Sequence, residues 1–237
     1  MEINSKLNMR IVKKIQSHGA NSSLYIVEDT QLNEIFMLKQ IDKNKIKESS
    51  KYFDEVRNVK DIENKNIVKV NYATYDDDNI YISMPYYKNG SLQDILQERN
   101  LTVREIVKYS LEILSGLYYI HKKNILHCDI KPSNILIDDY GCAVLADFGS
   151  AININHSGVG KLKNVYYKHI APEQCYSSRV DVRVDIYQLG NTLYRMCNGE
   201  EEYNKQVKKS KNMTELKNAI VNGSFPSRKK YYPHIPR

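Results

Sequence analysis

Short runs of aliphatic, β-branched and aromatic residues fill the first third of the chain, with Gly, Asn and Asp between them. Runs of this kind, bounded by turn-forming residues, predict β-strands. They cover Ile11–Ile15, Ser23–Glu28, Glu34–Ile41, Ile67–Tyr75 and Ile80–Met84. Between the third and fourth runs, from residue 43 to residue 64, apolar residues recur every three positions, as they do on one face of a helix. We therefore expect an antiparallel meander interrupted by one helix.

From residue 91 onwards the apolar spacing is that of helices. Ser91–Asp94 and Thr102–Glu105 both have the form of a capping box, which marks the start of a helix. The helix after the second box is expected to run to about residue 121. Its apolar stripe consists of Ile106, Ile113, Leu114, Leu117 and Ile120. Short strands are expected at residues 135–137 and 143–145. A further helix over Val184–Cys197, ending near Gly199, has apolar residues at Ile186, Leu189, Leu193 and Met196.

A β-rich segment followed by a helical one is typical of the α+β class. Turn-forming residues gather at Pro85–Gly90. The sequence therefore predicts two lobes, a small antiparallel β-sheet lobe with one helix over residues 1–84 and a larger, mainly helical lobe over residues 91–237, with a hinge at 85–90. A cleft between the lobes is the expected ligand site.

Composition excludes several classes of protein. Hydrophobic residues make up 41% of the 237 positions and charged residues 27%, which excludes a disordered polyelectrolyte and a collagen-like repeat. The four cysteines have no C-x-x-C spacing suited to zinc or redox chemistry. The N-terminal residues include no apolar signal region, and no run of about 18 uncharged apolar residues occurs. We expect a reduced, cytoplasmic protein that is neither secreted nor inserted into a membrane.

The net charge of +7 is concentrated near the C-terminal end. Residues 1–204 hold 26 basic and 27 acidic residues, whereas residues 205–237 hold 9 and 1. A neutral body does not favour nucleic-acid binding. The basic segment 205–237 is interpreted as a solvated terminal segment or, alternatively, as a docking patch for an acidic partner.

The candidate chemistry lies in a polar loop between two apolar anchors, in the run Ile125–Leu136. Asp129 can accept a hydroxyl proton, Lys131 can neutralise a phosphoryl group, and Asn134 can offer an oxygen to a hard cation such as Mg²⁺. Thirteen residues after Asn134, Asp147 adds a carboxylate for the same cation, followed by Phe148 and Gly149. Two oxygen ligands and a lysine are typical of a nucleotide-phosphate site.

These residues resemble the catalytic loop H-R-D-x-K-x-x-N and the D-F-G motif of the Hanks-type serine/threonine protein kinase family. Ala171-Pro172-Glu173 resembles its A-P-E motif, and Phe36–Lys39 resembles V-A-I-K. Each short motif alone is more often structural than catalytic. Their common order makes chance a poor explanation, and the resemblance implies a kinase fold.

The resemblance also assigns roles to residues. It implies that Asp129 is the catalytic base, that Lys131 binds the γ-phosphate, and that Asn134 and Asp147 hold Mg²⁺. Lys39 would bind the α- and β-phosphates of ATP and pair with Glu55 on the first helix. Further nucleotide contacts are expected at Ile15, Gly19, Leu24, Met84, Pro85, Tyr87 and Leu136. In the hinge, Pro85 would offer only its carbonyl to adenine while Tyr87 donates its N–H, so the missing N–H of proline is not needed.

The sequence departs from the family pattern at several points. The phosphate loop keeps only Gly19 of the usual three glycines. Cys128 replaces the arginine that normally pairs with a phosphorylated activation segment, so we expect activity that is constitutive or controlled by a partner. The family pattern continues through two further helices, which include an arginine partner for the glutamate at position 173. A shortened C-terminal lobe is therefore expected.

Three functions remain open from the sequence. The first is an ATP- and Mg²⁺-dependent serine/threonine protein kinase that acts on protein hydroxyls. The alternative is a kinase-fold pseudoenzyme that serves as a binding or scaffold module, favoured by the sparse glycine loop. A small-molecule phosphotransferase ranks last, because such relatives usually lack the catalytic-loop lysine and the A-P-E motif.

Overall fold

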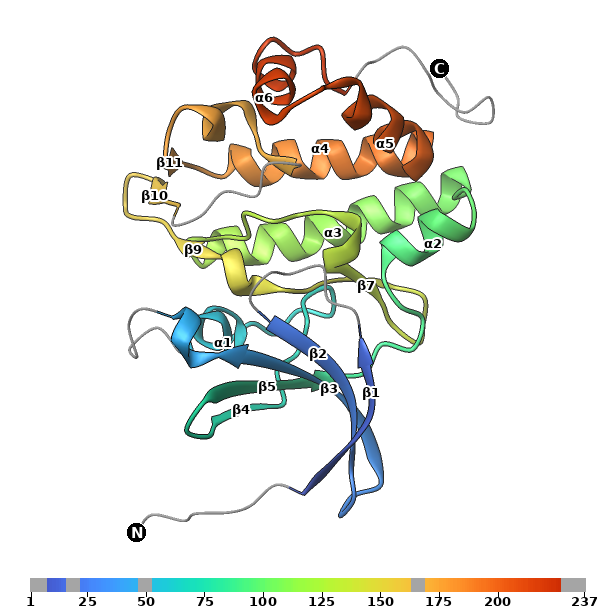
Figure 1. Ribbon diagram of the computed structural model, residues 1–237, viewed down its shortest axis with the longest axis vertical. Coiled ribbons are helices and arrows are strands. Elements are labelled where there is room, and N and C mark those ends of the chain that lie inside the picture. Colours follow the sequence, from blue (N-terminus) through green and yellow to red (C-terminus); the bar gives the residue numbers. More distant parts are fainter. Residues whose placement is uncertain (1–7, 16–21, 47–52, 163–168, 227–237) are drawn as a thin grey trace. The chain divides into compact units, whose positions relative to one another are not determined.

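The computed structural model describes residues 8–15, 22–46, 53–162 and 169–226 (Figure 1). The chain forms two compact units. The first unit comprises residues 1–61 and 68–87, and the second comprises residues 62–67 and 88–237. The predicted α+β class is confirmed, because the first unit is built on an antiparallel sheet and the second is mainly helical.

The first unit is a five-stranded antiparallel sheet in the order β1-β2-β3-β5-β4. Its strands are β1 (Met9–Ile15), β2 (Ser22–Asp29), β3 (Glu34–Asp42), β4 (Tyr72–Tyr75) and β5 (Asn79–Pro85). The antiparallel meander predicted at the start of the chain is confirmed for β1, β2 and β3, whereas β5 rather than β4 pairs with β3. Val27, Ile80 and Ile82 form the fully buried part of this unit, and the central strand β3 places Lys39 opposite Ile82.

The helix predicted between residues 43 and 64 is much shorter than expected within the described residues, and positions 47–52 of the prediction lie outside them. Lys43–Lys45 form only a 3-10 turn, which the side chain of Asp42 caps by accepting from the N–H of Asn44. The α-helix itself, α1 (Asp54–Val59), begins with two acidic residues in its first turn. The recurrence of apolar residues every three positions therefore predicted a helix here but overestimated its length.

Residues 62–67 belong to the second unit, which corrects the prediction that residues 1–84 form one lobe. Asn66 is fully buried there, and its Nδ2 donates to the carbonyl of Ala143 at 2.9 Å. Ile67 forms a single parallel bridge with Leu145. These contacts hold the segment against the second unit, so the strand predicted from residue 67 begins only with β4.

The second unit combines helices with short two-stranded ribbons (Figure 1). Its helices are α2 (Leu92–Glu98), α3 (Val103–Lys122), α4 (Arg183–Asn198), α5 (Glu200–Lys209) and α6 (Met213–Val221). The ribbons pair β6 (Ile125–Leu126) with β9 (Ile152–Asn153), β7 (Ile135–Ile137) with β8 (Ala143–Leu145), and β10 (Gly160–Lys161) with β11 (Arg179–Val180). The predicted positions of α2, α3, α4, β7 and β8 are confirmed.

The core of the second unit lies against one face of α3. Ile106, Ile113, Leu117 and Ile120 are buried as predicted. Leu114, predicted in the same stripe, is instead 42% exposed. The reason is geometric, since a residue one position after Ile113 is rotated about 100° away from the core.

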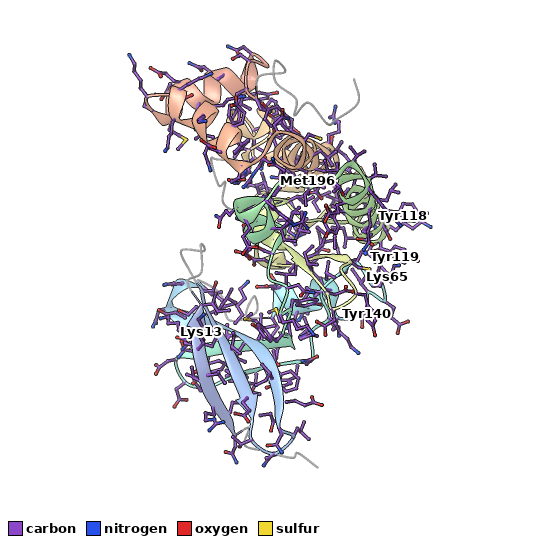
Figure 2. All side chains as sticks on the ribbon, turned by 90° about the vertical axis from the view of Figure 1, so that its right-hand side faces the viewer. Lys13, Lys65, Tyr118, Tyr119, Tyr140 and Met196 are labelled. Carbon is purple, nitrogen blue, oxygen red and sulfur yellow. The ribbon has the colours of Figure 1, made fainter. Side chains whose placement is uncertain are left out.

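Helix α4 runs beside α3 (Figure 1). Leu189 and Met196, the second of which is labelled in Figure 2, are buried as predicted. Ile186, predicted to be apolar and buried, is 50% exposed. The buried face of α4 is instead largely polar, and it contains Asp185, Gln188, Asn191, Thr192, Arg195 and Asn198.

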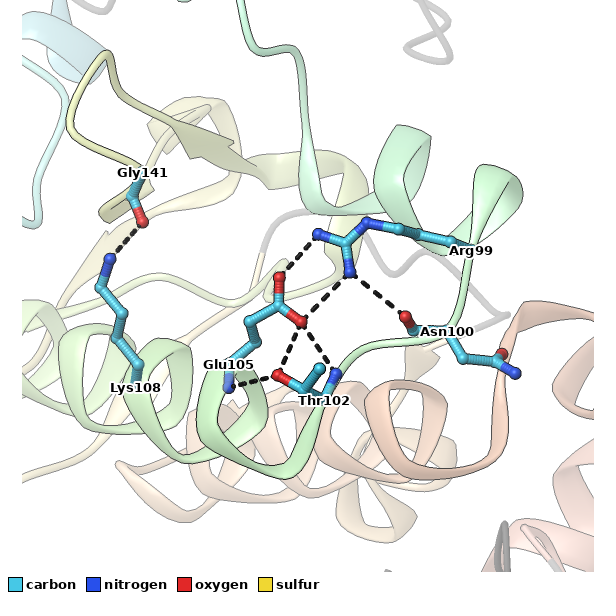
Figure 3. A network of polar contacts seen from close by, with 6 residues as sticks. All are labelled: Arg99, Asn100, Thr102, Glu105, Lys108 and Gly141. Carbon is cyan, nitrogen blue, oxygen red and sulfur yellow. Dashed lines mark hydrogen bonds and ion pairs between the residues drawn. The ribbon is translucent and has the colours of Figure 1, made fainter. Parts of the chain in front are cut away.

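Both predicted capping boxes are present. The Ser91 side chain accepts from the N–H of Asp94, and Thr102 does the same for Glu105. The carboxylate of Glu105 also accepts from the guanidinium of Arg99, at 2.6 Å, and from the N–H of Thr102, at 2.8 Å (Figure 3). The bond from Arg99, the largest cause, lowers the pKa of Glu105 to about 2. This network fixes the turn between α2 and α3.

The segment predicted as a solvated basic terminus is partly a packed helical region. Within the described residues, α6 and the end of α5 occupy most of residues 205–226. Tyr203, Leu216, Ile220 and Phe225 pack with Ile170 in one buried cluster. Leu216 and Ile220 are four residues apart on one face of α6, a spacing that the interpretation from net charge did not consider. Residues 227–237 lie outside the described part.

All four cysteines are free thiols. Among the described residues, no helix combines the length and the apolar character needed to cross a membrane.

Candidate active site

The predicted catalytic loop connects β6 to β7 in the second unit. It ends in a 3-10 turn, Pro132–Asn134, in which proline occupies the first position, where no N–H is needed. Asp129 and Asn134 are buried, with exposed fractions of 5% and 6%. The loop is therefore a fixed part of the unit, and its polar side chains require partners.

The structure brings three predicted catalytic residues together around one carboxylate. Lys131 Nζ donates to Asp129 Oδ2 at 2.7 Å, and Asn134 Nδ2 donates to the same oxygen at 2.9 Å. Asn134 Nδ2 also donates to the backbone carbonyl of Asp129 at 2.9 Å. These bonds fix the orientation of the carboxylate, and no bond is recorded at its Oδ1 atom among the described residues.

His127 is fully buried beneath the loop. Its ring lies against Phe148, with ring centroids 4.7 Å apart. Nε2 lies 3.1 Å from the carbonyl of Ala146, and Nδ1 accepts from the N–H of Asp129 at 3.3 Å. Because a carbonyl only accepts and an amide N–H only donates, these contacts select the neutral tautomer with the proton on Nε2. His127 thus links the loop to the strand end that carries Asp147.

Two side chains of α4 hold the backbone of the loop. Asp185 accepts from the N–H of His127 at 2.9 Å and from that of Cys128 at 2.8 Å. Gln188, three residues further on, accepts from the N–H of Ile130 at 2.8 Å and donates to the carbonyl of Cys128 at 3.0 Å. The amide of Gln188 therefore binds the backbone on both sides of Asp129.

Sequence reasoning missed Gln188. It is 2% exposed, and it lies one helical turn from Asp185 on the same face of α4. A glutamine on the buried face of an amphipathic helix requires hydrogen-bond partners. That signal could have found the residue, but it could not have shown which loop supplies the partners.

Cys128, which replaces the expected arginine, is buried and has a backbone φ of +64°. Burial, followed by the nearby carboxylates of Asp185 and Asp129, raises the pKa of its thiol well above the ordinary value. The thiol is therefore neutral, and it offers no cation at the position where the family pattern has an arginine. The loop is held through its backbone instead.

The two predicted metal ligands lie on adjoining strand ends. The N–H of Ala146 donates to the carbonyl of Asn134 at 2.9 Å, which ties the residue before Asp147 to the catalytic loop. Asp147 is exposed and has a φ of +62°, a left-handed conformation that is uncommon for residues other than glycine. An amide and a carboxylate fit Mg²⁺, which is usually bound by one or two carboxylates together with phosphate oxygens.

In the first unit, Lys39 and Glu55 form the predicted pair. Lys39 Nζ donates to Glu55 Oε1 at 2.7 Å and to Oε2 at 2.9 Å. The side chains are only 8% and 15% exposed. Lys39 comes from the central strand β3 and Glu55 from the first turn of α1, so the sheet and the helix together hold this ammonium group.

The remaining predicted nucleotide contacts are placed as follows. Ile15 at the end of β1 stands opposite Leu24 on β2. Met84 and Pro85 are the last two residues of β5, and Tyr87 follows this strand. Leu136 is half-buried on β7 in the second unit. Gly19 lies outside the described residues. The roles of all these residues in nucleotide binding stay predictions.

The model of the protein kinase domain matches residues 11–234, which is most of the chain. The chain belongs to the protein kinase family. The match includes both units and every residue assigned above to phosphate transfer. The family expected from the motifs is therefore confirmed.

Several curated kinases are similar to this chain. The serine/threonine-protein kinase CLA4 of Candida albicans is 31% identical over 199 residues, which cover 82% of the chain and 20% of that protein. A protein of Clostridium perfringens named as a probable serine/threonine-protein kinase is 30% identical over 192 residues, 78% of the chain and 28% of the relative. A similarly named protein of Dictyostelium discoideum is 33% identical over 189 residues, with coverages of 78% and 38%. The chain thus spans a fifth to about two fifths of the length of these relatives.

The A-P-E motif of this kinase chain begins a 3-10 turn, Pro172–Cys175. Gln174 Oε1 accepts from the N–H of the buried Ala171 at 2.6 Å, which fixes the start of the turn. Glu173 is half-buried and forms no ion pair with any described residue.

Proposed function

We propose that this kinase chain is an ATP-dependent serine/threonine protein kinase that transfers the γ-phosphate of ATP to a protein hydroxyl. The observation that carries the proposal is the setting of Asp129. Its carboxylate is buried, is oriented by Lys131 and Asn134, and sits in a backbone that α4 fixes from both sides. Phosphoryl transfer depends mainly on positioning and electrostatic stabilisation, and this arrangement supplies both.

The roles of the loop residues follow from their chemistry. Asp129 orients the attacking hydroxyl and accepts its proton. Lys131 lies 2.7 Å from that carboxylate, so its ammonium group is placed to neutralise negative charge on the transferred phosphoryl group. Asn134 and Asp147 supply hard oxygen ligands for Mg²⁺, which when bound neutralises charge on the phosphates of ATP.

For ATP binding, the proposal assigns Lys39 to the α- and β-phosphates, held in place by Glu55. The adenine ring would use main-chain groups of the segment that follows β5, with the carbonyl of Pro85 accepting and the N–H of Tyr87 donating. Ile15, Leu24, Met84 and Leu136 would offer apolar contacts, and Gly19 the close approach of backbone to phosphate.

Two observations support serine or threonine as the acceptor. Lys131 lies two residues after Asp129, as in the serine/threonine branch that the chain resembles. The curated relatives cited above are named serine/threonine-protein kinases. The cytoplasm is proposed as the site of action. An acidic partner for residues 205–237 also stays a proposal, which is supported only by the local excess of basic residues.

The test is transfer of radiolabelled phosphate from ATP, with Mg²⁺, to a generic basic protein and to the chain itself, followed by phosphoamino-acid analysis. We expect phosphoserine or phosphothreonine. Lys39→Met should raise the KM for ATP by at least about tenfold, because it removes a charge-assisted contact. Lys13→Met, a change at an exposed lysine on β1 (Figure 2), should leave it unchanged.

Circular dichroism would establish that both lysine variants are folded, since breaking the buried Lys39–Glu55 pair also lowers stability. Nucleotide binding without any transfer would favour the pseudoenzyme. Phosphotyrosine as the sole product would exclude serine/threonine specificity.

A further inference from the structure

Helix α3 has a second apolar stripe, on the side that faces away from the core. Its members are large apolar residues with exposed fractions of 37–62%, namely Val103, Val107, Leu111, Leu114 and Tyr118. We call these five residues the outer seam. Single exposed apolar residues are common on protein surfaces, but a continuous row along one helix is typical of an interaction site.

The spacing of the outer seam is that of helix pairing. Its steps are four, four, three and four residues. From Val107 to Tyr118 the alternation of four and three matches the a and d positions of a heptad, which in coiled coils face a partner helix. At 1.5 Å per residue the seam is about 22 Å long, and it is one row wide. A row of this width fits a second helix, whereas a lipid surface engages a broader apolar face.

The charges beside the outer seam are basic. Lys108 and Lys122 occupy the heptad positions next to it, where charges select the partner, and Arg104 is exposed near its first turn. Lys122 Nζ lies 4.8 Å from the centroid of the Tyr118 ring, and Lys108 Nζ donates to the carbonyl of Gly141 at 2.6 Å (Figure 3). The ammonium group of Lys122 therefore lies beside the seam, whereas that of Lys108 is held by the carbonyl of Gly141.

The acidic residues of α3 do not offset this charge. Glu105 is held by Arg99 and by the N-cap Thr102 (Figure 3). Glu112 is half-buried and accepts from the N–H of Ala143 at 2.7 Å. The exposed charge along this face is consequently positive.

Aromatic residues extend the surface at the C-terminal end of α3. Tyr118 and Tyr119 are both exposed and meet edge to face, with ring centroids 6.0 Å apart. Figure 2 shows Tyr140 and Lys65 on the same side of the unit as these two rings. Tyrosine is enriched at protein interfaces because its ring is large and loses little conformational entropy on binding.

We propose that the outer seam docks an amphipathic helix of a partner protein, with apolar residues in its centre and Asp or Glu on its flank. The charge favours this occupant over a second copy of the chain. Two copies of α3 packed antiparallel through the seam would set Lys108 and Lys122 of one copy against the same lysines of the other. The proposal is independent of kinase activity, because the seam includes none of the residues assigned to phosphate transfer.

The test uses two designed helical peptides of about 21 residues, both with leucine at the a and d positions. One has glutamate at the flanking positions and the other has lysine. Fluorescence anisotropy should give a dissociation constant on the order of 10 μM for the glutamate peptide, as for a small transient interface, and at least tenfold weaker binding for the lysine peptide.

Two variants of the seam test separately the contributions of its apolar row and of its flanking charges to peptide binding. Leu111→Glu should weaken binding of the glutamate peptide at least tenfold, and the double change Arg104→Glu with Lys122→Glu should reverse the preference between the peptides. The matched control is Leu32→Glu, because Leu32 in the first unit is 64% exposed and Leu111 is 62% exposed. Since all these side chains lie on the surface, the variants should keep the thermal midpoint of the wild type.

Four results would overturn the proposal. They are no binding of either peptide, equal binding of both, seam-dependent self-association in sedimentation equilibrium, and seam-dependent binding to phosphatidylserine vesicles in place of the glutamate peptide.

Discussion

At the scale of single residues, Gln188 is the least expected part of the site. Its amide binds the backbone immediately before and after Asp129. The types and order of Asp129, Lys131 and Asn134 were readable from the sequence because they lie within six residues of one another. The role of Gln188 could not be predicted from the sequence, because its partners are 58 and 60 positions away in the chain. Contacts over such separations depend on tertiary packing, which periodicity does not encode.

Replacing Gln188 tests whether it positions Asp129. Gln188→Leu keeps the size of the side chain but leaves the carbonyl of Cys128 and the N–H of Ile130 without their partners, at a cost of about 1–3 kcal/mol each. We expect kcat to fall about 10–100-fold through misplacement of the carboxylate, with the KM for ATP unchanged. Steady-state kinetics, corrected for the folded fraction, measures both constants.

Two further variants of buried glutamines make this result interpretable. Gln206→Leu in α5 removes a similarly buried amide far along the chain from the loop, so it should affect stability alone. Gln188→Glu keeps the acceptor for Ile130 but loses the donor to Cys128, so its kcat should lie between those of wild type and Gln188→Leu. An unaltered kcat in fully folded Gln188→Leu would exclude the positioning role.

At the scale of elements, the helices of the second unit that follow capping boxes were predicted well, whereas the helix of the first unit was predicted too long. The capping boxes at Ser91 and Thr102 are local signals, and α2 and α3 begin one residue after them. Of the helix expected between residues 43 and 64, the described residues form only α1, which ends at Val59 before the segment 62–67 joins the second unit. The amphipathic helices α5 and α6 were not predicted, because the segment was interpreted from its net charge and not from the spacing of its apolar residues. Their apolar faces were nevertheless present in the sequence.

The network at the start of α3 predicts a pH dependence of stability. The pKa of Glu105 is lowered to about 2. A carboxyl group with a lowered pKa in the folded state stabilises the protein above its unfolded pKa, and the stabilisation is lost as the pH falls through the folded value. Because this side chain is a quarter exposed, solvent screening limits its contribution to the free energy of unfolding to about 1 kcal/mol.

Glu105→Gln should therefore lower the free energy of unfolding by about 1 kcal/mol at pH 6, and by less than half of that at pH 3. Urea denaturation at the two pH values measures both. Glu63→Gln, at an exposed carboxylate that pairs with no described residue, should change neither. A difference between wild type and Glu105→Gln that stays constant from pH 6 to pH 3 would contradict the role of this network.

At the scale of the whole molecule, the second unit continues beyond α4 through α5 and α6. Leu216 is 4% exposed and packs with Tyr203, Ile220 and Phe225 around Ile170, which directly precedes the A-P-E turn. Leu216→Ala should lower the free energy of unfolding by about 2–4 kcal/mol, because it leaves a cavity in this cluster. Chemical denaturation checks this value. Met213→Ala, at an exposed residue of the same helix, should lower the free energy of unfolding far less. An equal decrease for the two variants would show that the cluster is not part of the cooperative core.

The sequence predicted the family and the class of the whole molecule because the kinase motifs are short, ordered and chemically specific. It did not predict that residues 62–67 belong to the second unit, nor that the side chain of Leu114 is exposed. Both depend on which face of an element meets the core. A basic net charge was equally uninformative, since much of the basic C-terminal region forms packed helices in its described part.

The central claim is that Asp129 acts as the base in phosphate transfer from ATP. The most direct measurement is the initial rate of transfer by wild type and by Asp129→Asn, at saturating ATP and Mg²⁺, with Asp139→Asn as the control at an exposed carboxylate. Asparagine preserves the shape of the side chain but cannot accept the proton. We predict a rate about 10²–10⁴-fold lower for Asp129→Asn, and a rate equal to wild type for Asp139→Asn. Equal rates for wild type and Asp129→Asn would contradict the mechanism.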